Sequence, residues 1–272
     1  MQVKSKKEIY DIAMYEITQK KLLAPNIYYM EVHAPRVAAS ALPGQFVIVR
    51  TGELGERIPL TVVDYDREKG TVAIVVQIVG ASSRKICALE QNDCFTDFVG
   101  PLGHPSEFVH ESDEELRSKK RLFIAGGVGT APVYPQVKWL RERGASADVI
   151  IGGKTQDFIL LDKEMEALGA TLHIATDDGS RGYHGMVTGL FKQLMDSGAR
   201  FDQVITIGPM IMMKFAALAT KEYGIPTIAS LNSMMVDGTG MCGACRVTVG
   251  GKVRFTCVDG PEFDAHQVDF DL

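Results

Sequence analysis

Four residues near the C-terminal end of the chain have the types and the spacing of a metal site. Two residues separate Cys242 from Cys245, eleven separate Cys245 from Cys257, and four separate Asp237 from Cys242. Glycines are interspersed among these residues, and glycine lets backbone amides crowd towards a charged sulfur atom. We interpret the stretch as a loop folded around a metal, with three thiolates and the Asp237 carboxylate as ligands.

Zinc and a [2Fe-2S] cluster both suit this ligand set. Structural zinc accepts three cysteines and one oxygen or nitrogen ligand. A plant-type [2Fe-2S] site has the spacing C-x4-C-x2-C followed by a distant cysteine. The chain reads D-x4-C-x2-C-x11-C, which is that spacing with Asp237 in the first position. A zinc ribbon more often has two separated CxxC pairs, and the plainest alternative is three buried cysteines that bind nothing.

A glycine-rich stretch in the middle of the chain has the composition of a nucleotide-binding turn. Gly126 to Pro132 follows the apolar run 121–125. Glycines at such a position let a pyrophosphate approach backbone amides at a helix N-terminus. Turn-rich polar segments also follow three further expected strands, at 152–155, 177–180 and 208–210. Together these segments predict a nucleotide-binding crevice. The stretch from Gly126 to Pro132 lacks the G-x-G-x-x-G spacing, and the alternative is a tight turn that binds no ligand.

An unusual strand, Arg57-Ile58-Pro59-Leu60-Thr61, lies in the first third of the chain. Arg57 could offer a bidentate fork to a phosphate. Pro59 lacks a ladder donor, which is typical of an edge or ligand-facing strand, and Thr61 could bond to a ring heteroatom. Taken alone, an arginine so close to a proline is more often a plain surface residue.

Two kinds of fold must position these motifs. Residues 1 to about 105 alternate and turn like an antiparallel β domain, and six short strands in that length predict a small closed barrel. The expected strands are 10–18, 27–34, 43–50, 57–63, 71–79 and 93–98, with a short helix at 82–89.

From residue 120 onwards, apolar runs alternate with helical segments, which predicts a parallel sheet with helices on both faces and ligands at the carboxyl ends of its strands. The expected strands are 121–125, 147–152, 171–176, 203–207 and 227–231, and the expected helices are 132–143, 161–168, 187–197 and 211–223. We therefore expect a β barrel over 1–105, an α/β domain over 106–228 and a small metal-binding domain over 229–272.

The composition of the chain argues against some classes of partner and some locations. The 272 residues are 46% hydrophobic and 23% charged, as in an ordinary soluble protein, and the net charge of −5 argues against nucleic acid. The longest apolar runs are strand-sized, so no membrane span is expected. The polar stretch Met1–Lys21 lacks the apolar core of a signal peptide. Five cysteines, three of them clustered, fit a reducing cytoplasm.

Together the motifs resemble the ferredoxin-NADP reductase superfamily, in which an FAD barrel precedes a pyridine-nucleotide domain. The strand 57–61 resembles its flavin motif, and the stretches 127–132 and 208–210 resemble its nucleotide motifs. The C-terminal cysteines narrow the resemblance to the branch of dihydroorotate dehydrogenase B electron-transfer subunits. That branch also holds the small subunits of NADH-dependent reduced ferredoxin:NADP oxidoreductases, which are sulfide dehydrogenase-like and bifurcate electrons. Asp237 in place of the first cysteine resembles this second type.

The resemblance implies a site for each cofactor. It assigns FAD to Arg57, Pro59, Leu60, Thr61, Ile78, Gly80, Ser82 and Ser83. It assigns the nicotinamide nucleotide to Gly127, Val128, Gly129, Thr130, Ala131, Pro132, Asp177, Asp178, Gly208, Pro209 and Met210. It assigns the [2Fe-2S] cluster to Asp237, Cys242, Cys245 and Cys257. NAD(H) is implied, and Lys154 keeps NADP(H) open.

The implied activity is hydride exchange between NAD(H) and FAD and single-electron exchange between FAD and the cluster, within an electron-bifurcating NADH/ferredoxin:NADP oxidoreductase. No side chain is expected to act as a catalytic acid or base, because the cofactors carry the chemistry. The implied partner is a larger flavin and iron-sulfur subunit, with ferredoxin reached through it. One alternative is the electron-transfer subunit of an NAD-dependent dihydroorotate dehydrogenase. An alternative of another class is a zinc-stapled nucleotide-binding subunit that regulates or scaffolds its partner.

Overall fold

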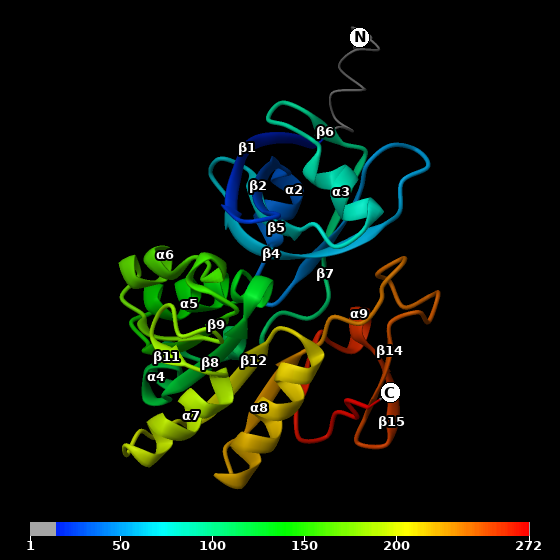
Figure 1. Cartoon of the computed structure of the whole chain (residues 1–272). Coiled ribbons are helices and arrows are strands. Elements are labelled where there is room, and N and C mark those ends of the chain that lie inside the picture. The colour runs from blue at the N-terminus through cyan, green and yellow to red at the C-terminus, as the bar shows by residue number, and fades with distance from the viewer. Residues whose placement is uncertain (1–14, 272) are drawn as a thin grey trace, which may run out of the picture.

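The structure is a computed structural model, and it describes residues 15–271. The start of the first expected strand and most of the polar N-terminal stretch lie outside the described residues. A β barrel occupies the top of Figure 1, an α/β sheet the lower left and a C-terminal segment the lower right. No helix within the described range is long and apolar enough to cross a membrane.

The barrel has seven strands, so the expected number of six is wrong. In sheet order β6-β1-β2-β5-β4-β3-β7, the two outermost strands are consecutive in the chain. The expected strand 93–98 divides at Thr96: its first piece pairs with β1 and its second with β3, which nearly closes the barrel. Thr96 is held at the crossing, because its N–H donates to Arg50 O (2.9 Å) and its Oγ1 accepts from Gly52 N (2.7 Å). The strands are β1 (Tyr15–Ala24), β2 (Ile27–His33), β3 (Phe46–Arg50), β4 (Ile58–Asp66), β5 (Thr71–Gln77), β6 (Cys94–Phe95) and β7 (Asp97–Leu102).

Strand β3 is buried on both faces, and this decides how the site is built. Val47 and Val49 point into the barrel core. Phe46 and Ile48 alternate with them and pack against the C-terminal segment. Successive side chains of a strand point to opposite faces, so one strand serves both cores. Two short helices, α2 (Pro35–Ser40) and α3 (Ala81–Cys87), complete the barrel.

The second sheet has the expected parallel strands with helices on both faces. Its order is β11-β10-β9-β8-β12-β13-β16, and only β16 runs antiparallel to its neighbour. Phe123 of β8 packs on the side of α5 and α6, whereas Leu122 packs on the side of α7 and α8. The strands are β8 (Arg121–Gly126), β9 (Ala147–Gly153), β10 (Thr171–Thr176), β11 (Tyr183–His184), β12 (Gln203–Ile207), β13 (Thr227–Ser230) and β16 (Glu262–Asp264). The helices are α4 (Asp113–Ser118), α5 (Val133–Glu142), α6 (Asp162–Ala167), α7 (Val187–Asp196) and α8 (Met210–Glu222), with 3-10 turns η1 (Glu107–His110), η2 (Gly127–Thr130) and η3 (Gln156–Phe158).

The C-terminal segment leaves the sheet after β13 and returns to it as β16. Between them lie a loop, the hairpin β14 (Arg246–Val249) and β15 (Lys252–Phe255), and the single-turn helix α9 (Thr256–Asp259). The return strand pairs with β13 through Ile228↔Asp264 and Ser230↔Glu262. This pairing anchors the end of the segment to the α/β sheet.

Candidate functional site

The hairpin brings two of the predicted cluster cysteines together. Arg246 pairs with Phe255 across β14 and β15, so Cys245, one residue before Arg246, and Cys257, two residues after Phe255, come close. Their Sγ atoms lie 3.2 Å apart, and the two side chains are only 1% and 2% exposed. Thr256 N also donates to Cys245 O at 3.0 Å, which fixes α9 against the loop.

The other two predicted ligands lie on the preceding loop. The Asp237 carboxylate accepts from Thr239 N (2.7 Å) and Cys242 N (2.8 Å), and these bonds hold the pKa of Asp237 below its usual value. Cys242 itself is exposed. Within residues 15–271, no three Cys, His, Asp or Glu side chains lie close enough together to hold a metal ion.

The chemistry of these donors nevertheless suits a metal cluster. Burial raises the pKa of the Cys257 thiol to about 11, and the adjacent Cys245 sulfur adds to the effect. The Cys257 sulfur can therefore ionise near neutral pH only beside a cation, as bound metal provides. The backbone N–H of Cys257 also donates to the Cys245 sulfur at 3.5 Å. Two paired sulfurs, an exposed thiol and an ionised carboxylate on one loop fit a four-ligand [2Fe-2S] site.

The cluster loop packs directly on the barrel. Cys245 and Cys257 belong to one apolar cluster with Phe46 and Ile48 of β3. Gly238 has φ +77°, and a Cβ there would lie 2.7 Å from Ile48 Cδ1. Only glycine allows this conformation and this approach without strain, so the loop and the strand are closely fitted.

The predicted flavin strand is the neighbour of β3 in the barrel sheet. Ile48 pairs with Pro59, and Phe46 pairs with Thr61. The ladder between β4 and β5 begins only at Val62, so residues 58–61 pair with β3 alone. The missing donor of Pro59 is therefore compatible with its place in the sheet. The predicted flavin strand and the cluster loop therefore both contact β3, the strand through the sheet ladder and the loop on the face that Phe46 and Ile48 share.

Arg57 links these two parts. Its Nε donates to Val236 O at 3.0 Å, and its Nη2 donates to Asp237 O at 3.3 Å. The same guanidinium is a predicted flavin ligand, and in the structure it bonds to the backbone of the cluster loop. No sequence signal points to this contact, since 179 positions separate Arg57 from Val236.

The second predicted flavin segment lies at the start of α3. Gly80 precedes the helix, and Ser83 Oγ accepts from Gly80 N at 3.0 Å. Ser82 Oγ donates to the Glu56 carboxylate. Ile78 N donates to Asn26 O at 2.9 Å, which ties the segment to the barrel.

Two of the predicted nucleotide loops are in close contact. A Cβ on Gly129 would lie 2.5 Å from Ile207 O and 2.7 Å from Gly208 Cα. Gly127 has φ +55° and has no atom within 4 Å of an added Cβ, so its surroundings are open. Thr130 is fully buried, and its Oγ1 has no partner among the described residues. A buried hydroxyl without a partner at this point suits the polar edge of a ligand.

The loops after β9 and β10 are joined by backbone hydrogen bonds. Asp177 N donates to Gly153 O (3.0 Å), and Asp178 N donates to Lys154 O (3.3 Å). Hydrogen bonds from Ser180 hold the pKa of Asp178 below its usual value. Pro209 is exposed, and Met210 is half-buried at the start of α8. All four predicted loops thus lie at the carboxyl ends of adjacent strands.

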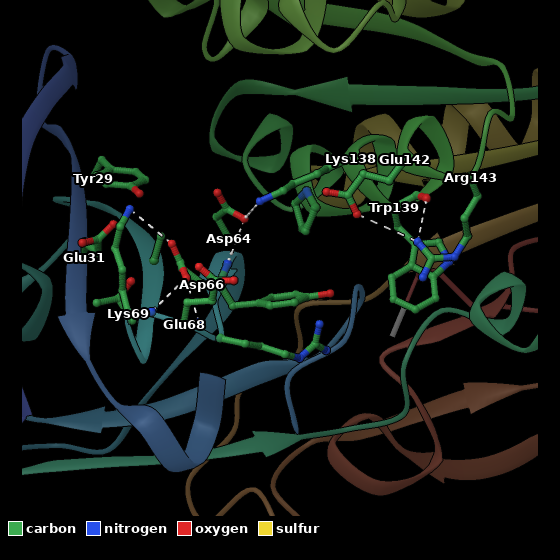
Figure 2. Close-up of a pocket in the computed structure, with 15 residues that line it drawn as sticks. Tyr29, Glu31, Asp64, Asp66, Glu68, Lys69, Lys138, Trp139, Glu142 and Arg143 are labelled. Carbon is green, nitrogen blue, oxygen red and sulfur yellow. Dashed lines mark hydrogen bonds and ion pairs between the residues drawn. The ribbon is translucent and has the colours of Figure 1, made fainter. Parts of the chain in front are cut away.

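A separate cleft of about 560 Å³ lies between the barrel and α5 (Figure 2). Its lining carries charges of both signs, and the Lys138 ammonium on α5 bonds to the Asp64 carboxylate on β4 at 2.7 Å. None of the site residues predicted from the sequence lines it. The cleft is therefore separate from the predicted cofactor residues, and the ion pair joins the barrel to the α/β sheet.

Sequence reasoning missed a polar junction around Glu262. Its Oε1 accepts from Ser106 Oγ (2.7 Å) and Gln136 Nε2 (3.3 Å). These residues belong to β16, to the connection after the barrel and to α5. The separations of 156 and 126 positions leave no local signal in the sequence.

Comparisons with known proteins agree with this arrangement. Residues 232–269 match the iron-sulfur cluster binding domain of dihydroorotate dehydrogenase B, and residues 123–217 match an oxidoreductase NAD-binding domain. The "uncharacterized protein in adh 3′ region" of Clostridium beijerinckii is 56% identical over 95% of this chain and 88% of its own length.

Two further relatives carry functional descriptions. The dihydroorotate dehydrogenase B (NAD(+)) electron transfer subunit homolog of Thermotoga maritima is 43% identical over 95% of this chain and 89% of its own length. A chain in the structure of NADH-dependent reduced ferredoxin-NADP oxidoreductase, described for flavin-based electron bifurcation, is 42% identical with a TM-score of 0.87. That match covers 95% of this chain and 91% of the other. The chain is an oxidoreductase subunit, and it belongs to the family of dihydroorotate dehydrogenase B electron transfer subunits.

Proposed function

We propose that the chain exchanges hydride between NAD(H) and FAD and single electrons between FAD and a [2Fe-2S] cluster, as the small subunit of an electron-bifurcating NADH/ferredoxin:NADP oxidoreductase. The bound cofactors supply the redox chemistry. The residues of the chain bind these groups, orient them and exclude water from the space between them.

One observation carries this proposal: the predicted flavin strand and the cluster loop both contact β3. Ile48 is paired with Pro59 and also packs against Gly238. Arg57 adds a second connection through the Val236 carbonyl. A buried strand that contacts both parts would hold the two bound groups at a fixed separation.

The division of the chain follows from this arrangement. We assign FAD to residues 1–105, NAD(H) to 106–228 and the cluster to 229–272. The match of 123–217 to a NAD-binding domain and of 232–269 to an iron-sulfur domain supports the second and third assignments. In our proposal Thr130 meets the ligand with its unpartnered hydroxyl, and the two aspartates after β10 face its ribose.

Charge at these loops favours NAD(H) over NADP(H). Asp177 and Asp178 are exposed beside the crevice, and Lys154 is exposed on the neighbouring loop. Carboxylates suit the hydroxyls of an unmodified ribose and repel a ribose phosphate. Because two carboxylates and only one ammonium group line this part of the crevice, we expect NAD(H) to bind better than NADP(H).

The surface around the cluster loop suits a protein partner. Cys242 is exposed there, and the neighbouring apolar side chains are unusually open to solvent, with Met241 at 89% and Met234 at 76%. An exposed apolar patch at a redox centre is typical of a docking surface. We assign this surface to the larger flavin and iron-sulfur subunit, through which ferredoxin would be reached. The exposed residues in question are Met234, Val236, Met241, Val253 and Val258.

A dihydroorotate dehydrogenase complex is the second candidate, because relatives such as the one in Thermotoga maritima bear that description. Asp237 in the first ligand position favours the bifurcating type. The assay is NADP+ reduction by the complex purified from its native cells under anaerobic conditions. We expect NADP+ reduction to require NADH and reduced ferredoxin together. Orotate formation from dihydroorotate with NAD+, and no ferredoxin requirement, would establish the second candidate instead.

A further inference from the structure

Glu262 is a carboxylate that the proposed electron transfer does not use, yet it sits where all three parts of the chain meet. Its Oε1 accepts from Ser106 Oγ and from Gln136 Nε2. A Cβ on Gly44, in the turn before β3, would lie 3.2 Å from the same oxygen. The barrel, the α/β sheet and the cluster segment therefore converge on one carboxylate oxygen.

The junction contains an acceptor that lacks a donor. Gln136 is completely buried, and its Oε1 has no hydrogen-bond partner among the described residues. An ionised carboxylate cannot supply that bond, since it only accepts. A neutral carboxylic acid can, because its hydroxyl donates to an amide oxygen while its other oxygen accepts from the amide nitrogen. A protonated Glu262 would satisfy both ends of the Gln136 amide.

The electrostatic surroundings also favour the neutral acid. Burial raises the pKa of Glu262 to about 7, the nearby Glu107 carboxylate on η1 adds to the rise, and the Ser106 hydrogen bond opposes it. The groups packed on it from the other elements carry no charge: Gln136 on α5, Gly44 before β3 and Ser230, its partner on β13. Within residues 15–271, no cation makes an ion pair with Glu262.

The junction lies beside both redox sites. Gln136 follows the nucleotide loop by one helical turn, and its Nε2 lies 3.5 Å from Pro132 O. Gly44 precedes Phe46, which packs with the cluster cysteines, by two residues. Negative charge added at either site disfavours an ionised carboxylate nearby.

We propose that Glu262 is a proton-binding site that closes the junction of the three parts and takes up a proton when the neighbouring cofactors are reduced. The carboxylate gains one proton from water and becomes the neutral acid, while the electron stays on the cofactors. The new O–H then donates to Gln136 Oε1. The coupling to reduction rests on the proposed function, whereas the proton site itself does not.

The proton site can be tested on the purified full-length chain by infrared spectroscopy. We expect a carboxylic-acid carbonyl band that is present at pH 6 and that weakens as the pH rises to 8. The band should be absent from Glu262→Gln and unchanged in Asp264→Asn. Asp264 lies on the same strand, but its carboxylate accepts from His266 N and Gln267 Nε2. Glu107→Gln should move the loss of the band to lower pH. A wild-type spectrum without such a band overturns the proposal, whatever cofactors are bound.

The coupling is tested by redox titration of the loaded chain at pH 6, 7 and 8. In the wild type, we expect the midpoint potential of the flavin or of the cluster to fall as the pH rises. The part of this pH dependence that comes from Glu262 should be absent from Glu262→Gln. An unchanged slope in the variant refutes the coupling. A chain that contains no flavin and no cluster refutes the proposed function, and the infrared experiment still decides the proton site.

Discussion

Replacing Ile48 by alanine tests whether β3 is the connection between the flavin strand and the cluster loop. Ile48 is fully buried and faces the cluster cysteines, whereas Val49, the next residue, is equally buried and faces the barrel core. The two side chains thus differ mainly in the core that they fill. Val49→Ala is therefore the matched control for Ile48→Ala.

The expected losses of stability are similar, and the expected functional losses are different. Truncating a buried isoleucine to alanine costs about 2–5 kcal/mol of unfolding free energy. Val49→Ala removes two buried carbons and should cost about 2 kcal/mol. Only the Ile48→Ala cavity opens beside Gly238 and the sulfur atoms of Cys245 and Cys257, so only that variant should loosen the cluster loop.

The assay combines chemical denaturation with measurements of iron and acid-labile sulfide per chain and of the rate of cluster reduction after NADH addition. We expect Ile48→Ala to lose cluster content or to slow its reduction by at least tenfold, and Val49→Ala to retain both. Equal cluster content and equal rates in the two variants would show that β3 is not the connection.

Three further variants test separate contacts. Gly238→Ala should cost roughly 2–4 kcal/mol, because φ is +77° and the new Cβ would lie 2.7 Å from Ile48 Cδ1; denaturation with urea measures it, and a neutral result would contradict the close fit. Asp237→Cys should lower the cluster potential, since thiolate is a softer, stronger donor than carboxylate; an EPR-monitored titration that finds no change would argue against Asp237 as a ligand. Glu262→Gln should remove a pH dependence of stability. The unfolded carboxyl ionises from about pH 4.5 upwards and the folded one only near 7, so wild-type stability should fall across that interval by up to about 3 kcal/mol and stay level above it. Unfolding of both proteins at pH 4, 6 and 8 checks this, and parallel curves would refute it.

Local patterns predicted much of the fold. The continuous apolar run 121–125 and the glycines after it indicated a buried parallel strand ending in a loop, and the structure has β8 and η2 there. The spacing of Cys242, Cys245 and Cys257 indicated a shared site, and the hairpin brings the last two within 3.2 Å of each other. Strands, turns and closely spaced ligands depend on residues that are near one another in the sequence, so periodicity and spacing can predict them.

The remainder depends on contacts between distant parts of the chain. The expected strand 93–98 became two strands because its halves pair with opposite edges of the barrel, and alternation alone cannot show which edge a residue meets. Arg57 stays a predicted phosphate ligand, and its local motif gave no sign of its bond to Val236, which lies 179 positions away. Glu262 carried no signal at all, because Ser106 and Gln136 surround it only after folding.

The most direct test of the central claim is the anaerobic absorption and EPR spectrum of the purified chain before and after NADH. We predict a flavin spectrum that bleaches and a rhombic signal of a reduced [2Fe-2S] cluster that appears with it. A flavin that bleaches while bound zinc is found and no EPR signal develops would contradict the account, because the C-terminal segment would then be a structural staple without electron transfer.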